Sequence, residues 1–542
     1  MKNIYMKSAV ALCVLGILSG CGMNQAKRSA NAAHKIAIEN HQGLLIEGNV
    51  SAALMQFPAV VTVVDKQGKM ATTSTDLHGN YQINVQGMTA PLVISAKEQG
   101  RQCHDESQQM GICLASLYFP SSGHMSQSAR VNLNPLSDAI TSHVAKTAGF
   151  AGPQALVDAK TSAKLSKTSY QQAIASIHAV FGKALVAFNL PKQFNPIDSA
   201  AKWQPQASKF YSMMWVNRSY QSSKGVPSET VLSDHYFRPL GVKNRDGQQL
   251  PVDLSVSYKK QQRVNDAKYR IFIVGDSTAS IYPAFRYPRM GWGQVFQQQF
   301  NPSDVQVIDG AQSGRSSRLY RNEGWFRYLS SMMRPGDYLF IQMGHNDEKC
   351  NGAKASRGPI DVANLCTYPN TANGKMQYPK DQPNMSFEKS LEFYIDYAKA
   401  HQVTPVLLTP TTRFKNAHGR TQTPIAYGHL TKNNSNSGYA FVGNYSQTIK
   451  DTARKNGVAL LDVETGTIVK ANQLGNANWK KYWLAVDPNV YPFYKNKTGR
   501  IDKPDSTHFQ QRGAQMVADI VASNIAANAK LANLAKYLVK SQ

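Results

Sequence analysis

Two short stretches, far apart in the chain, carry residue types that could perform acyl transfer. In IFIVGDSTAS, residues 271–280, four apolar β-formers end at Gly-Asp-Ser-Thr, so Ser277 directly follows a predicted buried strand. In DSTHF, residues 505–509, Asp505 precedes His508 by three positions. A serine hydroxyl becomes a nucleophile when a histidine accepts its proton and a carboxylate orients the imidazole. These three side chains are candidates for a catalytic triad.

Two other strand-like segments are followed by residues suited to stabilising an oxyanion. VQVIDG leads to Gly314 within GAQSGRSSR, and YLFIQMG leads to Asn346 within GHND. A glycine N–H can approach a tetrahedral intermediate closely because no Cβ intervenes, and an asparagine amide is a neutral donor. Each motif alone is also typical of an ordinary turn, helix cap or loop. Their order and their place at strand ends favour a functional site.

The elements that must position these residues are apolar segments separated by helix-length intervals. They are RIFIVGD, VQVIDG, YLFIQMG, VTPVLLTP and VALLDV. Near-continuous runs of Val, Ile and Leu are typical of strands covered on both faces, so we predict an α/β fold with a parallel sheet and flanking helices. Ligands bind beyond the carboxyl ends of such strands, which is where the candidate residues fall.

Taken in order, these motifs resemble the four blocks of the SGNH, or GDSL-type, hydrolase superfamily. GDSTASIYP, RMGWGQVF, SGRSSR, FIQMGHND and LLTPTTRF are similar, more narrowly, to segments of rhamnogalacturonan and pectin acetylesterases. The resemblance implies a three-layer parallel-sheet domain. It also implies roles for five residues: Ser277 as nucleophile, His508 as base, Asp505 as the group that orients the imidazole, and the Ser277 N–H, the Gly314 N–H and the Asn346 amide as oxyanion donors.

The same resemblance implies a function. The chain is expected to be a serine esterase that removes acetyl groups from pectic polysaccharide or oligosaccharides, with no metal or cofactor. Two alternatives stay open: a lipid-directed SGNH esterase or lysophospholipase with the same triad, and a non-enzymatic glycan-binding lipoprotein. The complete set of motifs argues against the second alternative.

The net charge favours an acidic partner. Lys and Arg number 60 against 34 Asp and Glu, which gives a formal charge of +26. Such a charge attracts anionic polysaccharide, nucleic acid or anionic lipid alike. The acetylesterase resemblance selects an acetylated acidic polysaccharide or oligosaccharide, and we expect no nucleic-acid partner.

Three further residues are candidates for substrate contacts. Arg315 and Arg413 follow the second and fourth predicted strands, where a guanidinium could bind a uronate carboxylate through two hydrogen bonds. His345 adjoins Asn346 and is interpreted as structural or substrate-contacting rather than as the base. Asp347 is expected to brace the same loop.

The first residues predict export. Lysines precede an apolar run over residues 9–18, which is too short to span a bilayer. The string LSGC resembles a bacterial lipobox, which implies a signal peptide over residues 1–20 and lipid attachment to Cys21. Similarity to Gram-negative lipoproteins implies, through Gly22, an exported protein anchored in the outer membrane, on its periplasmic or surface face.

Four other cysteines form two near pairs, Cys103 with Cys113 and Cys350 with Cys366. Neither pair has C-x-x-C spacing, so metal binding is the weaker interpretation. We predict two local disulfides formed in an oxidising compartment.

The chain divides into segments of different character. Short β-rich runs between Gly, Asn and Asp turns predict a β-sandwich, and apolar residues spaced three or four apart predict helices. The predicted organisation is a signal peptide (1–20), a polar tether (21–42), a β-sandwich-like domain (43–130), a helical region that includes Met214 and Trp215 (131–224), a connecting segment containing LPVDLSVSYKK (225–268) and the catalytic domain (269–542).

Overall fold

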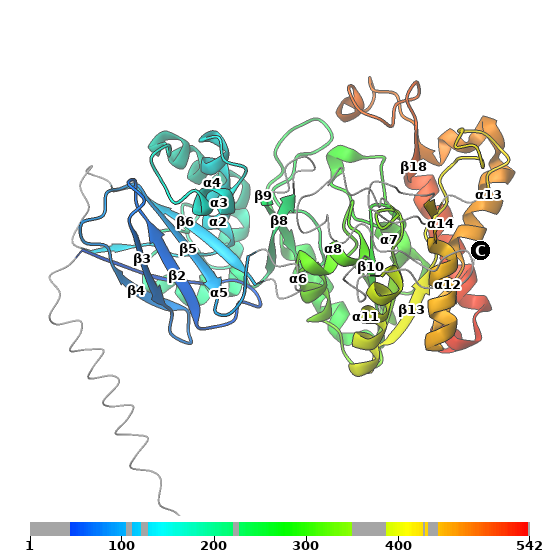
Figure 1. Cartoon of the computed structure of the whole chain (residues 1–542), viewed down its shortest axis with the longest axis horizontal. Coiled ribbons are helices and arrows are strands. Elements are labelled where there is room, and N and C mark those ends of the chain that lie inside the picture. The colour runs from blue at the N-terminus through cyan, green and yellow to red at the C-terminus, as the bar shows by residue number, and fades with distance from the viewer. Residues whose placement is uncertain are drawn as a thin grey trace, which may run out of the picture.

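The computed structural model describes residues 44–103, 111–120, 128–220, 227–348, 386–426, 429–431 and 443–539. Within these ranges, two units lie in contact: an N-terminal unit, and a C-terminal unit built on a helix-covered sheet (Figure 1). The signal peptide, the lipid anchor at Cys21 and the Cys350–Cys366 pair lie outside the described residues and stay predictions. Among the helices of those ranges, none has the length and apolar character that crossing a bilayer requires.

The N-terminal unit contains a β-sandwich. Its sheets have the strand orders β4-β1-β7 and β3-β2-β5-β6. The strands are β1 (Leu45–Asn49), β2 (Ala59–Val64), β3 (Met70–Ser74), β4 (Asn80–Asn84), β5 (Leu92–Glu98), β6 (Cys113–Tyr118) and β7 (Ser128–Arg130). Val61 and Val63 of β2 and Ile46 of β1 are buried in one core, as expected when alternate side chains of two sheets face each other.

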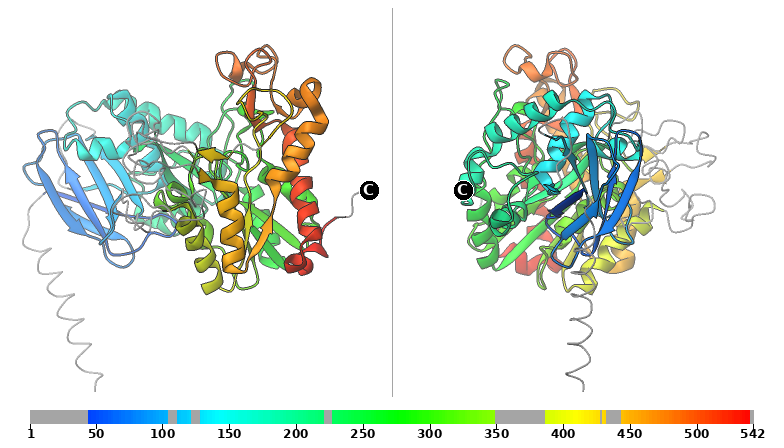
Figure 2. Two further views of the ribbon diagram at one scale, coloured as in Figure 1. Left: turned by 45° about the vertical axis from the view of Figure 1, so that its right-hand side comes forward. Right: turned by 90° about the vertical axis from the view of Figure 1, so that its left-hand side faces the viewer.

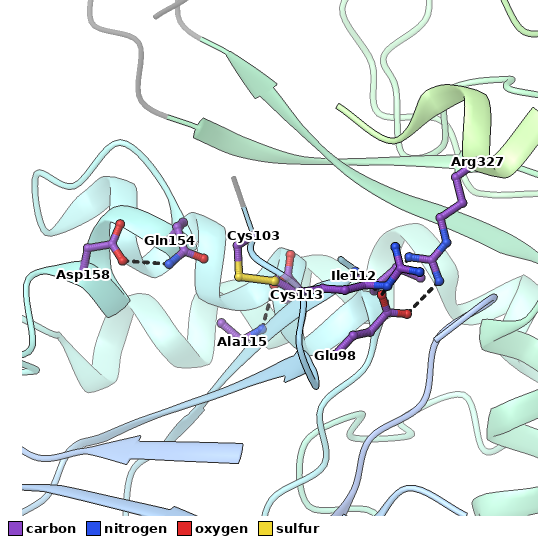
Figure 3. The surroundings of a disulfide bond; sticks show 10 residues. Glu98, Cys103, Ile112, Cys113, Ala115, Gln154, Asp158 and Arg327 are labelled. Atoms are coloured by element: carbon purple, nitrogen blue, oxygen red, sulfur yellow. Dashed lines mark hydrogen bonds and ion pairs between the residues drawn. A yellow bond between two sulfur atoms is a disulfide. The ribbon is translucent and has the colours of Figure 1, made fainter. Parts of the chain in front are cut away.

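Cys103 and Cys113, the first residue of β6, form the predicted disulfide (Figure 3). Close to it, Glu98 at the end of β5 accepts hydrogen bonds of 2.7 Å from Nη1 and Nη2 of Arg327, a residue of the C-terminal unit. Glu98 is fully buried, so this ion pair lies within the contact between the units. The disulfide therefore braces a segment beside the interface.

The helical region is shorter than predicted. It contains α2 (Pro135–Thr147), α3 (Pro153–Asp158), α4 (Lys167–Ala187) and α5 (Gln204–Tyr211), but Met214 begins strand β8 (Met214–Tyr220), which pairs antiparallel with β9 (Pro227–Asp234). Trp215 stacks on Tyr328 of the C-terminal unit, with 4.6 Å between ring centroids. The assignment of Met214 and Trp215 to helix was wrong, because these residues are held in a strand by pairing with β9 and by ring stacking, which their local spacing does not show.

The segment 225–268 is also more structured than a connection. It contains β9, and the stretch LPVDLSVSYKK enters helix α6 (Ser255–Asp266). Val252 and Leu254 are buried before the helix, whereas within it Ser257 and Val264 are the buried residues. The apolar alternation continues into the helix through Val256 and Tyr258, whose side chains are exposed there. A spacing of two residues is not the spacing of a helix, so the pattern did not predict α6.

The C-terminal unit has a five-stranded parallel sheet with the order β11-β10-β12-β13-β16, which confirms the predicted α/β class. Its strands are β10 (Tyr269–Gly275), β11 (Val305–Asp309), β12 (Tyr338–Gln342), β13 (Thr404–Leu408) and β16 (Ala459–Leu461). In β10, Ile271 and Ile273 enter one core while Phe272 and Val274 enter the other. The sheet is therefore covered on both faces.

Helices complete the two outer layers, as the turned views of Figure 2 show. One layer comprises α8 (Ser317–Asn322), α9 (Trp325–Ser330), α11 (Phe387–Ala400) and α12 (Tyr445–Asn456); the other comprises α7 (Trp292–Val295), α13 (Val463–Asn478) and α14 (Gln511–Ala527). Val517, Val521 and Ile525 form the buried stripe of α14. Packing of this helix fixes the position of the short strand β18 (Asp505–Phe509), which immediately precedes it.

Candidate active site

The carboxyl end of β10 and the short strand β18 bring Ser277, His508 and Asp505 together. Nε2 of His508 lies 2.9 Å from Oγ of Ser277, and Nδ1 of His508 lies 2.7 Å from Oδ2 of Asp505. An ionised carboxylate can only accept, so the proton resides on Nδ1 and the serine hydroxyl donates to Nε2. The arrangement has the connectivity of a nucleophile, a base and an orienting acid.

The charge states of the pair follow from its surroundings. Burial opposes ionisation of Asp505, but the hydrogen bond and charge of His508, with the N–H of Thr507, hold the pKa of the carboxyl well below its usual range. Burial lowers the pKa of His508, and the charge of Arg289 lowers it further, against the opposing effect of Asp505. At neutral pH the pair is a carboxylate and a neutral imidazole, so Nε2 can accept a proton.

A hydrogen-bond chain fixes the turn that carries Ser277. Oδ1 of Asp276 accepts from the N–H and the hydroxyl of Thr278, each at 2.8 Å. The Thr278 hydroxyl accepts from Nε2 of Gln342 at 2.9 Å, and Oε1 of Gln342 accepts from Nε1 of Trp292 at 2.6 Å. Since Gln342 ends the neighbouring strand β12, the nucleophile turn is tied to the sheet.

The predicted oxyanion donors come from the ends of adjacent strands. Gly314, after β11, has φ +82°, a conformation that favours glycine. Among the described residues, neither the Ser277 N–H nor the Gly314 N–H donates to another protein group. The Asn346 amide, after β12, donates to the carbonyl of Arg315 at 3.1 Å. Three potential donors thus lie on loops at the same edge of the sheet as the nucleophile.

Asp347 ties the loop of Asn346 to the start of α8. Its Oδ1 accepts from the N–H and the hydroxyl of Ser317, at 2.9 and 2.6 Å, and its Oδ2 accepts from the N–H of Gly344 at 3.1 Å. Burial raises the pKa of Asp347 to about 7, with the nearby charge of Asp276 adding to the rise. This contact set is what the bracing role expected of Asp347 requires.

The two arginines predicted to bind uronate are already occupied. Nε of Arg315 lies 2.6 Å from Oε2 of Glu323, a fully buried carboxylate. Arg413 is bonded to the carboxylate of Glu348. Because each guanidinium is paired within the protein, the structure does not favour either as a free carboxylate receptor.

His345 is buried rather than presented to solvent. Its Nε2 lies 3.3 Å from the Thr411 hydroxyl, and its ring meets that of His429 edge to face at 4.5 Å. In the described ranges, His345, Glu348 and His429 offer ligand atoms that all lie within 4.8 Å of one another, a spacing that a metal ion could use. A cation there would have to compete with the guanidinium of Arg413 for Glu348.

Three side chains beside the nucleophile were missed from the sequence. The hydroxyl of Tyr282 donates to the Ser277 carbonyl at 2.6 Å, and Nη2 of Arg289 donates to that hydroxyl at 2.9 Å. The guanidinium of Arg286 lies 5.4 Å from the centroid of the same Tyr282 ring. The sequence shows that two arginines follow the nucleophile within a few residues. It does not show that they lie beside it, because that depends on how the segment folds back.

Residues 273–516 match the model of the GDSL-like Lipase/Acylhydrolase family, and this range includes the three strand ends and β18. These residues form a GDSL-like hydrolase domain. The protein is a carboxylic ester hydrolase.

Two curated relatives align with this domain. Rhamnogalacturonan acetylesterase RhgT of Bacillus subtilis is 28% identical over 257 residues, which cover 47% of this chain and 89% of the relative. The protein named "Probable rhamnogalacturonan acetylesterase YesY", also from B. subtilis, is 27% identical over 258 residues, covering 47% and 91%. The solved structure of B. subtilis YxiM aligns over 48% of this chain and 57% of that chain, with 18% identity and a TM-score of 0.31.

Proposed function

We propose that this GDSL-like esterase removes acetyl groups from pectic polysaccharide or oligosaccharides of the galacturonan or rhamnogalacturonan type. The observation that carries the proposal is the hydrogen-bonded series Ser277, His508 and Asp505 at the carboxyl edge of the parallel sheet. The substrate class is supported by the names of the two curated relatives. Both relatives align with the unit that contains this site.

In the proposed acylation step, Oγ of Ser277 attacks the carbonyl carbon of the acetyl ester while its proton passes to Nε2 of His508. Asp505 stabilises the imidazolium that forms. The oxyanion accepts hydrogen bonds from the N–H groups of Ser277 and Gly314 and from the Asn346 amide, which exchanges its bond to the Arg315 carbonyl for this one. His508 then donates the proton to the sugar oxygen, and the saccharide leaves with a free hydroxyl group.

Deacylation repeats the sequence with water. His508 accepts a proton from the water molecule as its oxygen attacks the acetyl carbonyl on Ser277. The second tetrahedral intermediate collapses, the proton returns to Oγ of Ser277, and acetate leaves. His508 accepts and donates the proton in each step of this cycle.

The test is acetate release by the purified protein from acetylated pectin, acetylated rhamnogalacturonan, acetylated xylan and a long-chain lipid ester. We expect the two pectic substrates to give the highest kcat/KM and the Ser277→Ala variant to release no acetate above background. A preference for the long-chain ester would instead support the lipid-directed alternative. Turnover of none of the four substrates by folded protein would reject the assignment.

We also propose that the protein is an exported lipoprotein anchored through Cys21. The lipobox-like LSGC supports this, as does the Cys103–Cys113 disulfide, which is typical of an oxidising compartment. Radiolabelled palmitate should be incorporated into the wild-type protein and not into a Cys21→Ala variant, and the label should fractionate with the outer membrane. Label retained by Cys21→Ala would contradict the anchor.

A further inference from the structure

Two arginines lie beside the proposed nucleophile. Nη2 of Arg289 donates to the hydroxyl of Tyr282, which in turn donates to the carbonyl of Ser277. The guanidinium carbons of Arg289 and Arg286 lie 4.5 and 5.4 Å from the centroid of the Tyr282 ring. Both cations therefore share one aromatic ring that is hydrogen-bonded to the backbone of the nucleophile.

The backbone of this segment is also fixed against the strand that carries the base. The Met290 N–H donates to the Phe509 carbonyl at 3.1 Å, and Arg289 forms a β-bridge with Gln510. Since His508 immediately precedes these residues, the arginine segment contacts both halves of the site. The position of the arginine segment is therefore fixed by backbone contacts with the segment that follows His508.

Neither guanidinium has an anionic partner. In the described part of the chain, Arg286 and Arg289 form no ion pair, and the Nε atom of each is buried without a hydrogen-bond acceptor. By contrast, Arg315 and Arg413 are paired with Glu323 and Glu348. Arg286 and Arg289, which lie beside the nucleophile, thus lack the ion pair that Arg315 and Arg413 have, although the charge of Arg289 also acts on the Asp505 carboxylate.

Such an arrangement is electrostatically unfavourable without an anion. Burial lowers the pKa of Arg286, and the like charge of Arg289 lowers it further. A bound carboxylate would relieve both effects, because it neutralises the two charges and its oxygens accept the hydrogen bonds that the guanidinium groups lack. Both arginines are only partly buried, so a ligand can reach them from solvent.

The aromatic ring of Phe493 lies next to Arg286. The guanidinium of Arg286 is 5.3 Å from the ring centroid of Phe493, and Nζ of Lys497 is 3.7 Å from the same centroid. The partly exposed Phe493 ring also packs against Phe285 at 5.1 Å. A partly exposed aromatic ring beside the Arg286 guanidinium suits a uronic acid, which combines a carboxylate with an apolar C–H face.

We infer that Arg286 and Arg289 form a carboxylate-binding subsite that selects acetyl esters carried by uronate residues, with Phe493 against the sugar face. This inference rests on the proposed acetylesterase function and names its specificity-determining residues. In it, the uronate carboxylate accepts hydrogen bonds from the two guanidinium groups while an acetyl group of the bound saccharide reaches Ser277. A uronate whose carboxyl is methyl-esterified loses the charge that the subsite recognises.

The experiment compares acetylated oligogalacturonides that have free carboxylates with the same oligosaccharides after methyl esterification. Acetate release gives kcat/KM for wild type, Arg286→Gln and a control, Lys164→Gln, which removes one exposed charge from the N-terminal unit. We expect wild type and the control to prefer the free acid by at least about tenfold, the scale of a charge-assisted hydrogen bond. Arg286→Gln should lose most of this preference through a lower kcat/KM on the free acid.

Equal kcat/KM of wild type on the two substrates, or an equal loss on both in Arg286→Gln, would overturn the subsite while leaving the acetylesterase function intact. Acetate release from neither substrate would reject both. A second measurement uses wild type alone and therefore does not depend on whether a variant folds. Unacetylated trigalacturonate should inhibit hydrolysis of a neutral aryl acetate at least about tenfold more strongly than the methyl ester of trigalacturonate does. Inhibition by inorganic phosphate as strong as that by trigalacturonate would overturn the uronate assignment.

Discussion

The imidazole of His508 lies 2.9 Å from the hydroxyl of Ser277, a residue 231 positions earlier in the chain. Ser277 is placed by β10 and its turn, whereas His508 is placed by β18 and by the packing of α14 behind it. The site therefore depends on two separately anchored elements. The catalytic side chains are not part of the hydrophobic cores, so substitutions of these side chains are expected to change activity without unfolding the domain.

Replacing Ser277 with alanine should lower kcat on a neutral ester by about 10⁴-fold or more, because the variant lacks the attacking oxygen. The melting temperature should stay close to that of wild type, since only one hydroxyl is removed. Ser303→Ala, on an exposed turn, is the control. Comparable turnover by folded Ser277→Ala would remove this residue from the mechanism.

Replacing Asn346 with alanine should lower kcat by about a hundredfold and change KM much less, because its amide is expected to bind the oxyanion only as negative charge develops. Steady-state kinetics on the same neutral ester give the two constants. An effect confined to KM would make Asn346 a substrate contact rather than an oxyanion donor.

The acidic limb of the pH profile should report His508. Protonated imidazole cannot accept the serine proton, so activity falls as pH drops through the pKa of His508. Burial and the charge of Arg289 lower that pKa, so the midpoint of the acidic limb in kcat/KM should lie below pH 6.5. Arg289→Gln removes a charge that lowers the pKa, so it should move the midpoint to higher pH. Lys164→Gln should leave the midpoint unchanged, and an unmoved midpoint in Arg289→Gln would reject this coupling.

Loss of the Cys103–Cys113 disulfide should destabilise the N-terminal unit by about 2–3 kcal/mol, because the bond closes a short loop in the unfolded chain. Denaturant unfolding of Cys103→Ser, compared with wild type under non-reducing conditions, measures the difference. Peptide mapping by mass spectrometry of the same wild-type sample checks the second predicted pair. A free thiol at Cys350 or Cys366 would contradict that pair.

Local sequence patterns were sufficient for the parallel sheet. In β10, the apolar run 271–274 ends in small and polar residues, and it fills the two cores on opposite faces of the sheet. The β8–β9 hairpin could not be read in this way. Strand β8 pairs with β9, and Trp215 stacks on both His235 and Tyr328, so the contacts that stabilise β8 come from other segments of the chain and are not visible in its own residues.

The sequence by itself also determined which residue types follow each strand, and hence the candidate chemistry at the edge of the sheet. Only the tertiary structure decided which arginines are available to a ligand. Arg315 pairs with a carboxylate 8 positions away and Arg413 with one 65 positions away, whereas Arg286 and Arg289 meet an aromatic ring and no carboxylate among the described residues. The sequence does not show whether an arginine has an ion-pair partner, because the partner is a neighbour in space that only folding brings close.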